Sequence, residues 1–140
     1  MTNPQDIVTL GTGIVTLLLD NADDIGIKTA ELRFEGQGVD IATPGIIVML
    51  SPPASPDMAR GLPQMQAWEC TLFICPEATA IVAHSAVAAM TIAQKAHLLL
   101  RRPYRGVLNL DASEPFAIVS ALPDNFICVV NYDVPFSLFP

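Results

Sequence analysis

Residues 44–50 read PGIIVML and residues 66–75 read QAWECTLFIC, and between them lies the proline-rich stretch SPPASPDMARGLP at 51–63. The first segment is a continuous apolar run, which is typical of an interior strand. Proline lacks the backbone donor of a ladder and blocks helix, so the stretch between the two segments is predicted to be an extended loop. Together the three segments predict a hairpin of two core strands with a long tip.

On the N-terminal side of this hairpin, the sequence predicts a helix that runs to about Asp20 or Asn21. Asn3 suits the cap of that helix, Pro4 its first turn and Asp6 its positive end. Its apolar residues recur at spacings of three and four and form one stripe: Ile7, Leu10, Ile14, Leu17 and Leu18. Two glycines, Gly11 and Gly13, weaken the helix locally and mark close packing against a neighbouring element.

Residues 31–35, ELRFE, alternate between charged and apolar side chains. This pattern predicts an edge strand with Leu32 and Phe34 inward and the charges outward.

On the C-terminal side, residues 76–79, PEAT, open a second helix that reaches about Leu100. Apolar residues surround most of its circumference, which favours a place between the sheet and a second layer, or in a subunit interface. Two strands follow, Phe116 to Leu122 and Phe126 to about Leu138. The last strand alternates, with Cys128, Val130, Tyr132 and Val134 among the residues of its apolar face.

The predicted fold class is therefore α/β of the α+β type, with a mixed or antiparallel sheet of about four to five strands packed by two main helices. No repeat, charge block or low-complexity linker divides the sequence, so residues 1–140 are interpreted as one domain.

The composition is poor in charge: 51% of the residues are hydrophobic and only 15% are charged, against the roughly 25% of an average soluble protein. Such a surface favours self-association, because copies of the chain would cover its apolar area. The alternative is a well-packed core below a surface rich in Ser, Thr and Pro.

The net charge of −7 does not suit a protein that grips phosphate backbones. The nearest approach to a basic patch is Arg101, Arg102 and Arg105, which are interpreted as complementing the negative end of the second helix. Nucleic-acid binding by charge is therefore not expected.

Neither apolar run resembles a targeting or membrane segment. Residues 7–19 are flanked by aspartates, and residues 79–100 are interrupted by His84, Gln94, Lys95 and His97. Three cysteines without a C-x-x-C pair are expected to be buried free thiols, and Cys70 and Cys75 should lie on opposite faces of their strand.

No catalytic or metal-binding constellation is recognised in the sequence. The two histidines are 13 positions apart on one helix, roughly 20 Å along its axis, so they cannot share a site. Each is interpreted as a satisfied core or interface histidine, with a pH-sensitive contact as the alternative. The trio Asp20, Asp23 and Asp24 lacks the glycine and distal glutamate of a calcium loop and is interpreted as a solvated helix end. The sequence therefore predicts no enzyme, cofactor or metal.

The order of the elements resembles that of the tail terminator proteins of long-tailed bacteriophages, the Mu-like and lambda-like small tail proteins. The likeness is carried by PGIIVM at 44–49, by the run from Trp68 to Cys75 that leads directly into a helix, and by the closing apolar strand from Ile127 to Phe139. It covers nearly the whole chain as an order of elements.

The resemblance implies a structural virion protein of the tail, assembled in the bacterial cytoplasm. Such proteins form a ring, expected here to be a homohexamer, that caps the tail tube, stops its polymerisation and joins it to the head-side connector. DNA would pass through the ring without specific binding. The alternatives are a tail tube or adaptor subunit, and a small-ligand-binding or degenerate enzyme module with a pocket under the hairpin tip.

The candidate interface residues are apolar or proline side chains of the tip and of the last five positions: Pro52, Pro53, Met58, Leu62, Met65, Phe136, Leu138 and Phe139. Those of the tip are adaptable contacts on a stiffened loop. Those after Pro135 continue the alternation of the last strand and are expected to contact another subunit, with folding back over their own helix as the alternative.

Overall fold

A computed structural model of the chain describes residues 7–34, 41–51, 67–77, 82–111, 115–122 and 125–135. Its elements in order are α1 (Ile7–Asp20), α2 (Ala22–Ile25), β1 (Thr29–Phe34), β2 (Gly45–Ser51), β3 (Ala67–Cys75), α3 (Val82–Leu100), β4 (Asn109–Leu110), β5 (Phe116–Leu122) and β6 (Asn125–Pro135).

The six strands form one mixed sheet in the order β1-β2-β3-β6-β4, with β5 also paired to β6. Only the β1–β2 pair is parallel, and all the other pairs are antiparallel. Both β4 and β5 run along the same edge of β6, because β4 pairs with Tyr132 and Asp133 while β5 pairs with residues from Asn125 to Val130.

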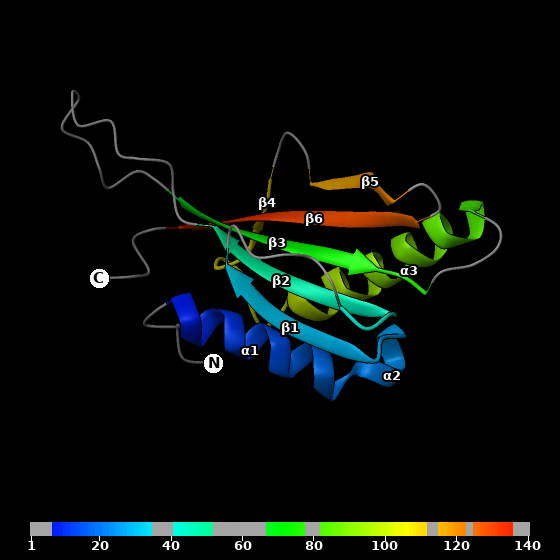
Figure 1. Cartoon of the computed structure of the whole chain (residues 1–140). Helices are drawn as coiled ribbons and strands as arrows, with labels where there is room; N and C mark the ends of the chain where they lie inside the picture. The colour runs from blue at the N-terminus through cyan, green and yellow to red at the C-terminus, as the bar shows by residue number, and fades with distance from the viewer. Residues whose placement is uncertain are drawn as a thin grey trace, which may run out of the picture.

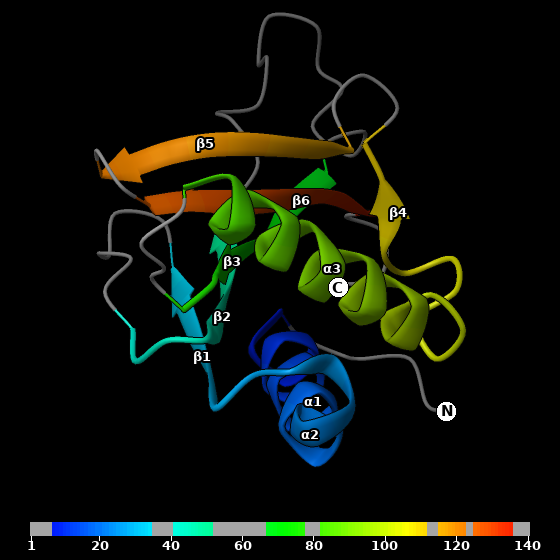
Figure 2. The same ribbon diagram turned by 90° about the vertical axis from the view of Figure 1, so that its right-hand side faces the viewer.

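The helices lie on one face of the sheet. In Figures 1 and 2, α1 and α2 lie under the β1 side of the sheet, while α3 runs under β6 and β5. The strands therefore bury the even-numbered side chains of β2 and β6 against the helices, and one core joins Leu10, Ile14, Val48, Val130 and their neighbours.

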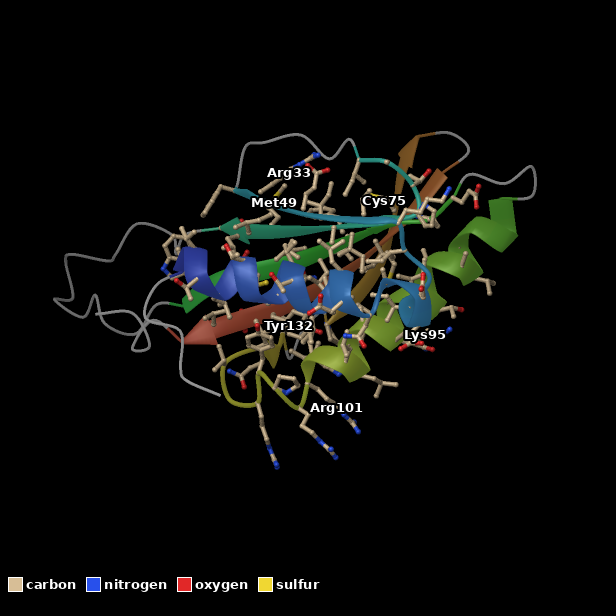
Figure 3. All side chains as sticks on the ribbon, turned by 90° about the horizontal axis from the view of Figure 1, so that it is seen from below. Arg33, Met49, Cys75, Lys95, Arg101 and Tyr132 are labelled. Carbon is tan, nitrogen blue, oxygen red and sulfur yellow. The ribbon has the colours of Figure 1, made fainter. Side chains whose placement is uncertain are left out.

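A smaller apolar cluster lies on the opposite face of the sheet. It consists of Ile47, Met49, Cys75 and Val129, with Ile41 and Phe73 packed against it. Met49 and Cys75 are labelled together with Arg33 on that side of the sheet in Figure 3. Since β2 is buried on both faces, its unbroken apolar sequence is accounted for.

The structure confirms the predicted fold class, and the sheet is of the mixed kind. The hairpin of β2 and β3, the edge position of β1 and the single stripe of α1 are also as predicted. The sixth strand is the two-residue β4, which has no periodic signal of its own in the sequence.

One expectation about a side chain is wrong. Phe34 is not buried: it ends β1 with 36% of its surface exposed, whereas Leu32 of the same strand packs against the core. Val87 and Leu98 of α3 are 65% and 56% exposed, so α3 has no second layer over that side among the described elements, and its alternative place in a subunit interface stays a prediction. The helix buries a narrower stripe through small side chains such as Ala89, Ala93 and Ala96.

The cysteines lie as expected. Cys70, Cys75 and Cys128 are free and buried, and Cys70 belongs to the helix-side core while Cys75 belongs to the opposite cluster. The described part of β6 alternates as predicted, from Cys128 to Val134.

All the candidate interface residues lie outside the described residues. This holds for Pro52, Pro53, Met58, Leu62 and Met65 of the tip and for Phe136, Leu138 and Phe139 after β6. Their assignment stays a prediction.

Close approach of α1 to the sheet depends on Gly11. A Cβ built on this glycine would lie 2.5 Å from Cδ1 of Leu32 and 3.0 Å from Cδ1 of Leu50. The glycine therefore serves helix–sheet packing, as the sequence predicts, at the expense of helix propensity.

We expect Gly11→Val to destabilise the protein by about 1–3 kcal/mol, because overpacking against Leu32 and Leu50 outweighs the small gain in helix propensity. Thr12→Val is the matched control: Thr12 is exposed on the same helix, and its change should stay within about 0.5 kcal/mol. Urea unfolding measures both, and equal stabilities of the two variants would contradict the packing described here.

Candidate functional site

The outward face of α1 is exposed and carries no charge until the last residue of the helix. Its stripe is formed by Val8, Thr12, Thr16 and Leu19, which recur at spacings of four, four and three and are all exposed. Val8 and Leu19 are 51% and 43% exposed. A solvent-facing helix usually carries charges on such a stripe, whereas charge is depleted at the centre of subunit interfaces.

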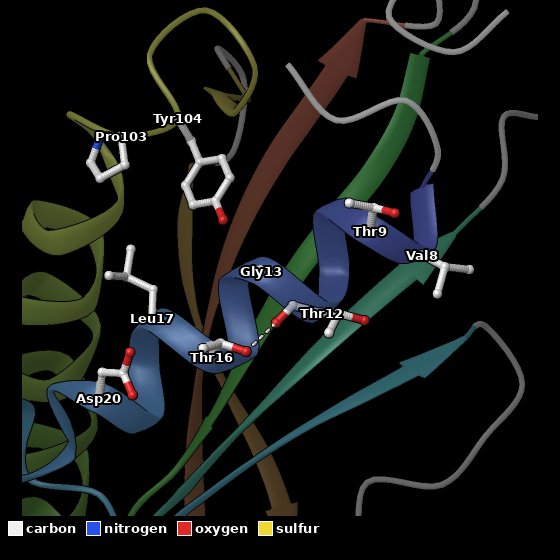
Figure 4. Close-up of a pocket in the computed structure, with 9 residues that line it drawn as sticks. All are labelled: Val8, Thr9, Thr12, Gly13, Thr16, Leu17, Asp20, Pro103 and Tyr104. Carbon is white, nitrogen blue, oxygen red and sulfur yellow. Dashed lines mark hydrogen bonds between the residues drawn. The ribbon is translucent and has the colours of Figure 1, made fainter. Parts of the chain in front are cut away.

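A hollow of about 590 Å³ lies between this helix and the turn that follows α3. Figure 4 shows the side chains that line it: Val8, Thr9, Thr12, Gly13, Thr16, Leu17, Asp20, Pro103 and Tyr104. Most of these side chains are hydroxyl-bearing or aliphatic. Asp20, at the end of α1, is the one charged residue among them.

Tyr104 forms the wall of the hollow that faces α1. It is only 8% exposed, and its backbone is fixed by hydrogen bonds to Leu100 on one side and to Val107 and Leu108 on the other. Its hydroxyl oxygen would lie 2.7 Å from a Cβ on Gly13, so the glycine makes room for the phenol. Burial raises the pKa of Tyr104, followed by the charge of Cys70.

The described lining of the hollow is mostly uncharged, and one of its hydroxyl donors is already used. The hydroxyl of Thr16 donates to the carbonyl of Thr12 at 2.9 Å, so this donor is used within the helix. None of the described lining residues is a histidine, cysteine or lysine that would activate a nucleophile. The arrangement suits a neutral, partly apolar group with an acceptor for the hydroxyl of Tyr104.

The outward face of α3 resembles that of α1. Val87, Thr91, Gln94, Lys95 and Leu98 are exposed, and Lys95 is the one charged residue among them. Both helices therefore present largely uncharged faces to the outside of the protein.

His97, on the inner side of α3, contacts β6 and β5. Its Nδ1 lies 2.8 Å from the hydroxyl of Tyr132, a hydrogen bond whose direction depends on the tautomer of the imidazole. The ring meets Phe116 edge-on at a centroid distance of 5.8 Å and stacks on Tyr132 at 5.9 Å. His97 is thus a satisfied core histidine, while the side chain of His84 lies outside the described residues.

The environment of this pair opposes charge. Burial lowers the pKa of His97, and the nearby Arg101 lowers it further. Burial also raises the pKa of Tyr132, with a smaller contribution from Cys70. Both rings are therefore neutral near pH 7, and they join α3 to β6 by a hydrogen bond.

The three arginines predicted to complement the helix end lie in the turn after α3. All three are exposed and line a hollow of about 350 Å³, which is separate from the one on α1. In the part of the chain that the structure describes, their guanidinium groups make no hydrogen bond to a carbonyl of α3.

A second polar site lies on the sheet face that the helices leave free. A hollow of about 220 Å³ is lined there by Glu69, Thr71, Asp111, Asn131, Tyr132 and Asp133. Thr71 donates a hydrogen bond to Oδ1 of Asn131 at 3.2 Å. Glu69 and Asp133 are direct partners in the β3–β6 register, so two carboxylates stand opposite each other.

The aspartates of the first helix end are exposed, as expected for a solvated end. Among the described residues no group of three or more His, Cys, Asp or Glu side chains is placed to hold a metal ion. Within the same residues, no helix combines the length and the hydropathy that a membrane crossing requires.

Sequence reasoning missed the hollow beside α1 and the polar hollow on the free face of the sheet. The signal for the first was present, because α1 lacks any charge between Ile7 and Leu19. The pairing of Glu69 with Asp133 has no local signal, since it depends on the register of strands more than 60 positions apart.

No protein-family model matches the chain, and none of the curated proteins compared with it matches significantly. What the protein does must therefore be inferred from its own residues.

We expect the stability of the protein to fall as the pH drops from 8 to 5.5, in part because of His97. Its pKa is lower in the folded state than the ordinary 6.5 of the unfolded chain, so unfolding takes up a proton as the pH falls below 6.5. His97→Gln should flatten this dependence in urea unfolding, and His84→Gln is the matched control. A pH dependence that His97→Gln leaves unchanged would contradict the assignment.

Proposed function

We propose that the protein is a structural subunit of a bacteriophage tail, a tail terminator that forms a ring on the last ring of the tail tube. The ring would stop tube polymerisation and join the tube to the head-side connector. The observation that carries this proposal is the exposed, uncharged outer face of α1 with its hollow. Such a face suits contact with another protein surface better than contact with water.

Three further features support the proposal. The outer face of α3 is also poor in charge, with Val87 and Leu98 exposed. The sheet ends in β1 on one side and in β4 and β5 on the other, and no described strand pairs with the outer edge of β1. Apart from the short elements α2 and β4, the helices and strands of the chain follow the order on which the resemblance rests.

The net charge supports the expected relation to DNA. Each subunit carries −7, so a ring of six carries six times that charge, and a negatively charged bore would let DNA slide without adhesion. The tail tube protein and the connector are the proposed partners. Contacts through Met58, Leu62, Met65 and the residues after Pro135 remain part of the proposal.

A second candidate function is a small-ligand-binding module, and the hollow beside Tyr104 favours it. Its lining comes from α1 and the turn after α3, a different place from the pocket under the hairpin tip that the sequence analysis considered. A ligand module should be a monomer or dimer whose melting temperature rises with its ligand.

We expect light scattering of the purified protein to give one closed oligomer, most simply a hexamer, at tens of micromolar. The same sample should show no tight, salt-dependent binding to duplex DNA in a gel-shift assay, because the subunit is acidic.

The measurement is repeated with the tail tube protein, since a terminator is able to close on its tube alone. A chain that stays monomeric both alone and with the tube protein would overturn the proposal. Tight DNA binding would overturn the role of the charge.

A further inference from the structure

The turn after α3 is a rigid support for three exposed cations. It is fixed by backbone hydrogen bonds from Tyr104 to Leu100, from Arg105 to Arg102 and from Val107 to Tyr104. Buried Tyr104 and Val107 anchor it to the core, while Arg101, Arg102 and Arg105 line one hollow outside. In Figure 3 the side chain of Arg101 points away from the ribbon at the end of α3.

These cations are not neutralised within the described subunit. In the described ranges the one ion pair is between Arg33 and Glu31 on β1, at 3.4 Å. Three guanidinium groups within five positions repel one another, so a fixed cluster of this kind is stabilised when an anionic partner binds it. We call Arg101, Arg102 and Arg105 the arginine turn.

The sheet face away from the helices carries negative charges that are close together. Glu69 of β3 and Asp133 of β6 stand directly opposite each other, and like charges in that position destabilise a sheet. Neither has an ion pair among the described residues. Burial raises the pKa of Asp133, and the charge of the nearby Asp111 raises it further. We call Glu69 and Asp133 the carboxylate pair.

The two patches lie on different surfaces of the subunit. The arginine turn follows the helix layer, whereas the carboxylate pair lies on the opposite face of β3 and β6. Among the described residues the two patches of one subunit form no ion pair with each other, whereas two copies placed head to tail would bring one patch of each together.

We propose that the arginine turn of one subunit binds the carboxylate pair of a second copy of this chain. The inference rests on the proposed function, because it needs a self-associating subunit. Charge complementarity selects the occupant: a copy of the chain offers two uncompensated carboxylates in a hollow, at the spacing of neighbouring strands. A nucleic acid fits less well, because it would have to approach a chain of net charge −7 to reach three arginines.

The contact has a direction. Because two different patches meet, the interface is heterologous, and repeated copies close into a ring or continue as a filament. The ion pairs would set the polarity and register of the assembly, while the uncharged faces of α1 and α3 supply buried area.

The test uses charge reversal in the full-length chain. Sedimentation velocity at about 25 mM NaCl compares the wild type with R102E/R105E and with E69K/D133K. Each variant should weaken association by roughly tenfold or more, since each opposes like charges across the interface. Their equimolar mixture should associate like the wild type, because every interface in an alternating assembly is then complementary.

Matched controls change the net charge equally at other exposed places. K28E is the control for the single reversal R105E, with the same change in net charge, and D23K/D24K is the control for E69K/D133K. Both controls should associate like the wild type. The neutral variant E69Q/D133N should weaken association and yet not lower the urea midpoint of the subunit, a combination that a purely structural role would not give.

The outcomes separate the inference from the proposed function. If association survives both charge reversals, or if the mixture fails to restore it, the arginine–carboxylate contact is overturned. The proposed ring is not affected by either result. A wild-type monomer at low salt, also with the tube protein, overturns both. Duplex DNA binding that is lost in R102E/R105E while association is unchanged assigns the arginine turn to nucleic acid and overturns the contact between copies.

Discussion

The fold depends on one strand, β6, which is held by partners along both of its edges and on one of its faces. One edge pairs with β3 along its length, and the other edge is shared by β4 and β5. Its even-numbered side chains, Cys128 to Val134, pack against the helix layer, and Tyr132 bonds His97 of α3. Because its backbone and one face are fully committed, β6 fixes where α3 and its turn lie. The positions of Tyr104 and the three arginines follow from that constraint.

The sequence predicted those parts of the fold whose signal is local. The unbroken apolar run of β2, the alternation of β6 and the stripe of α1 each reflect how many faces of the element are buried. Gly11 and Gly13 were informative for the same reason, since a glycine inside an apolar helix has a packing cause. The predicted burial of Phe34 was wrong. Alternation predicts which face of a strand a side chain lies on, but it does not predict how far along the strand a helix covers that face.

The candidate sites were mostly beyond the sequence, because each is made by a long-range register. Glu69 becomes a partner of Asp133 only when β3 and β6 pair, and Tyr104 meets Gly13 only when α3 places its turn over α1. Neither contact produces a pattern within a short stretch of sequence. The interpretation of the arginines as partners of the helix end was reasonable from spacing alone. The turn that directs them outward depends on buried Tyr104, whose role needs the folded core.

The distribution of charge over the subunit has a consequence for assembly. Large interfaces tolerate few charges at their centre, and α1 and α3 meet that condition with one carboxylate and one ammonium on their outer faces. Uncharged faces associate without a preferred direction, since apolar burial is not directional. A protein that must form a closed assembly, rather than an aggregate, needs a polar contact that specifies one neighbour and one orientation. In the proposed assembly, unpaired charges concentrated at two separate places would provide that specification, at the expense of the stability of the isolated subunit.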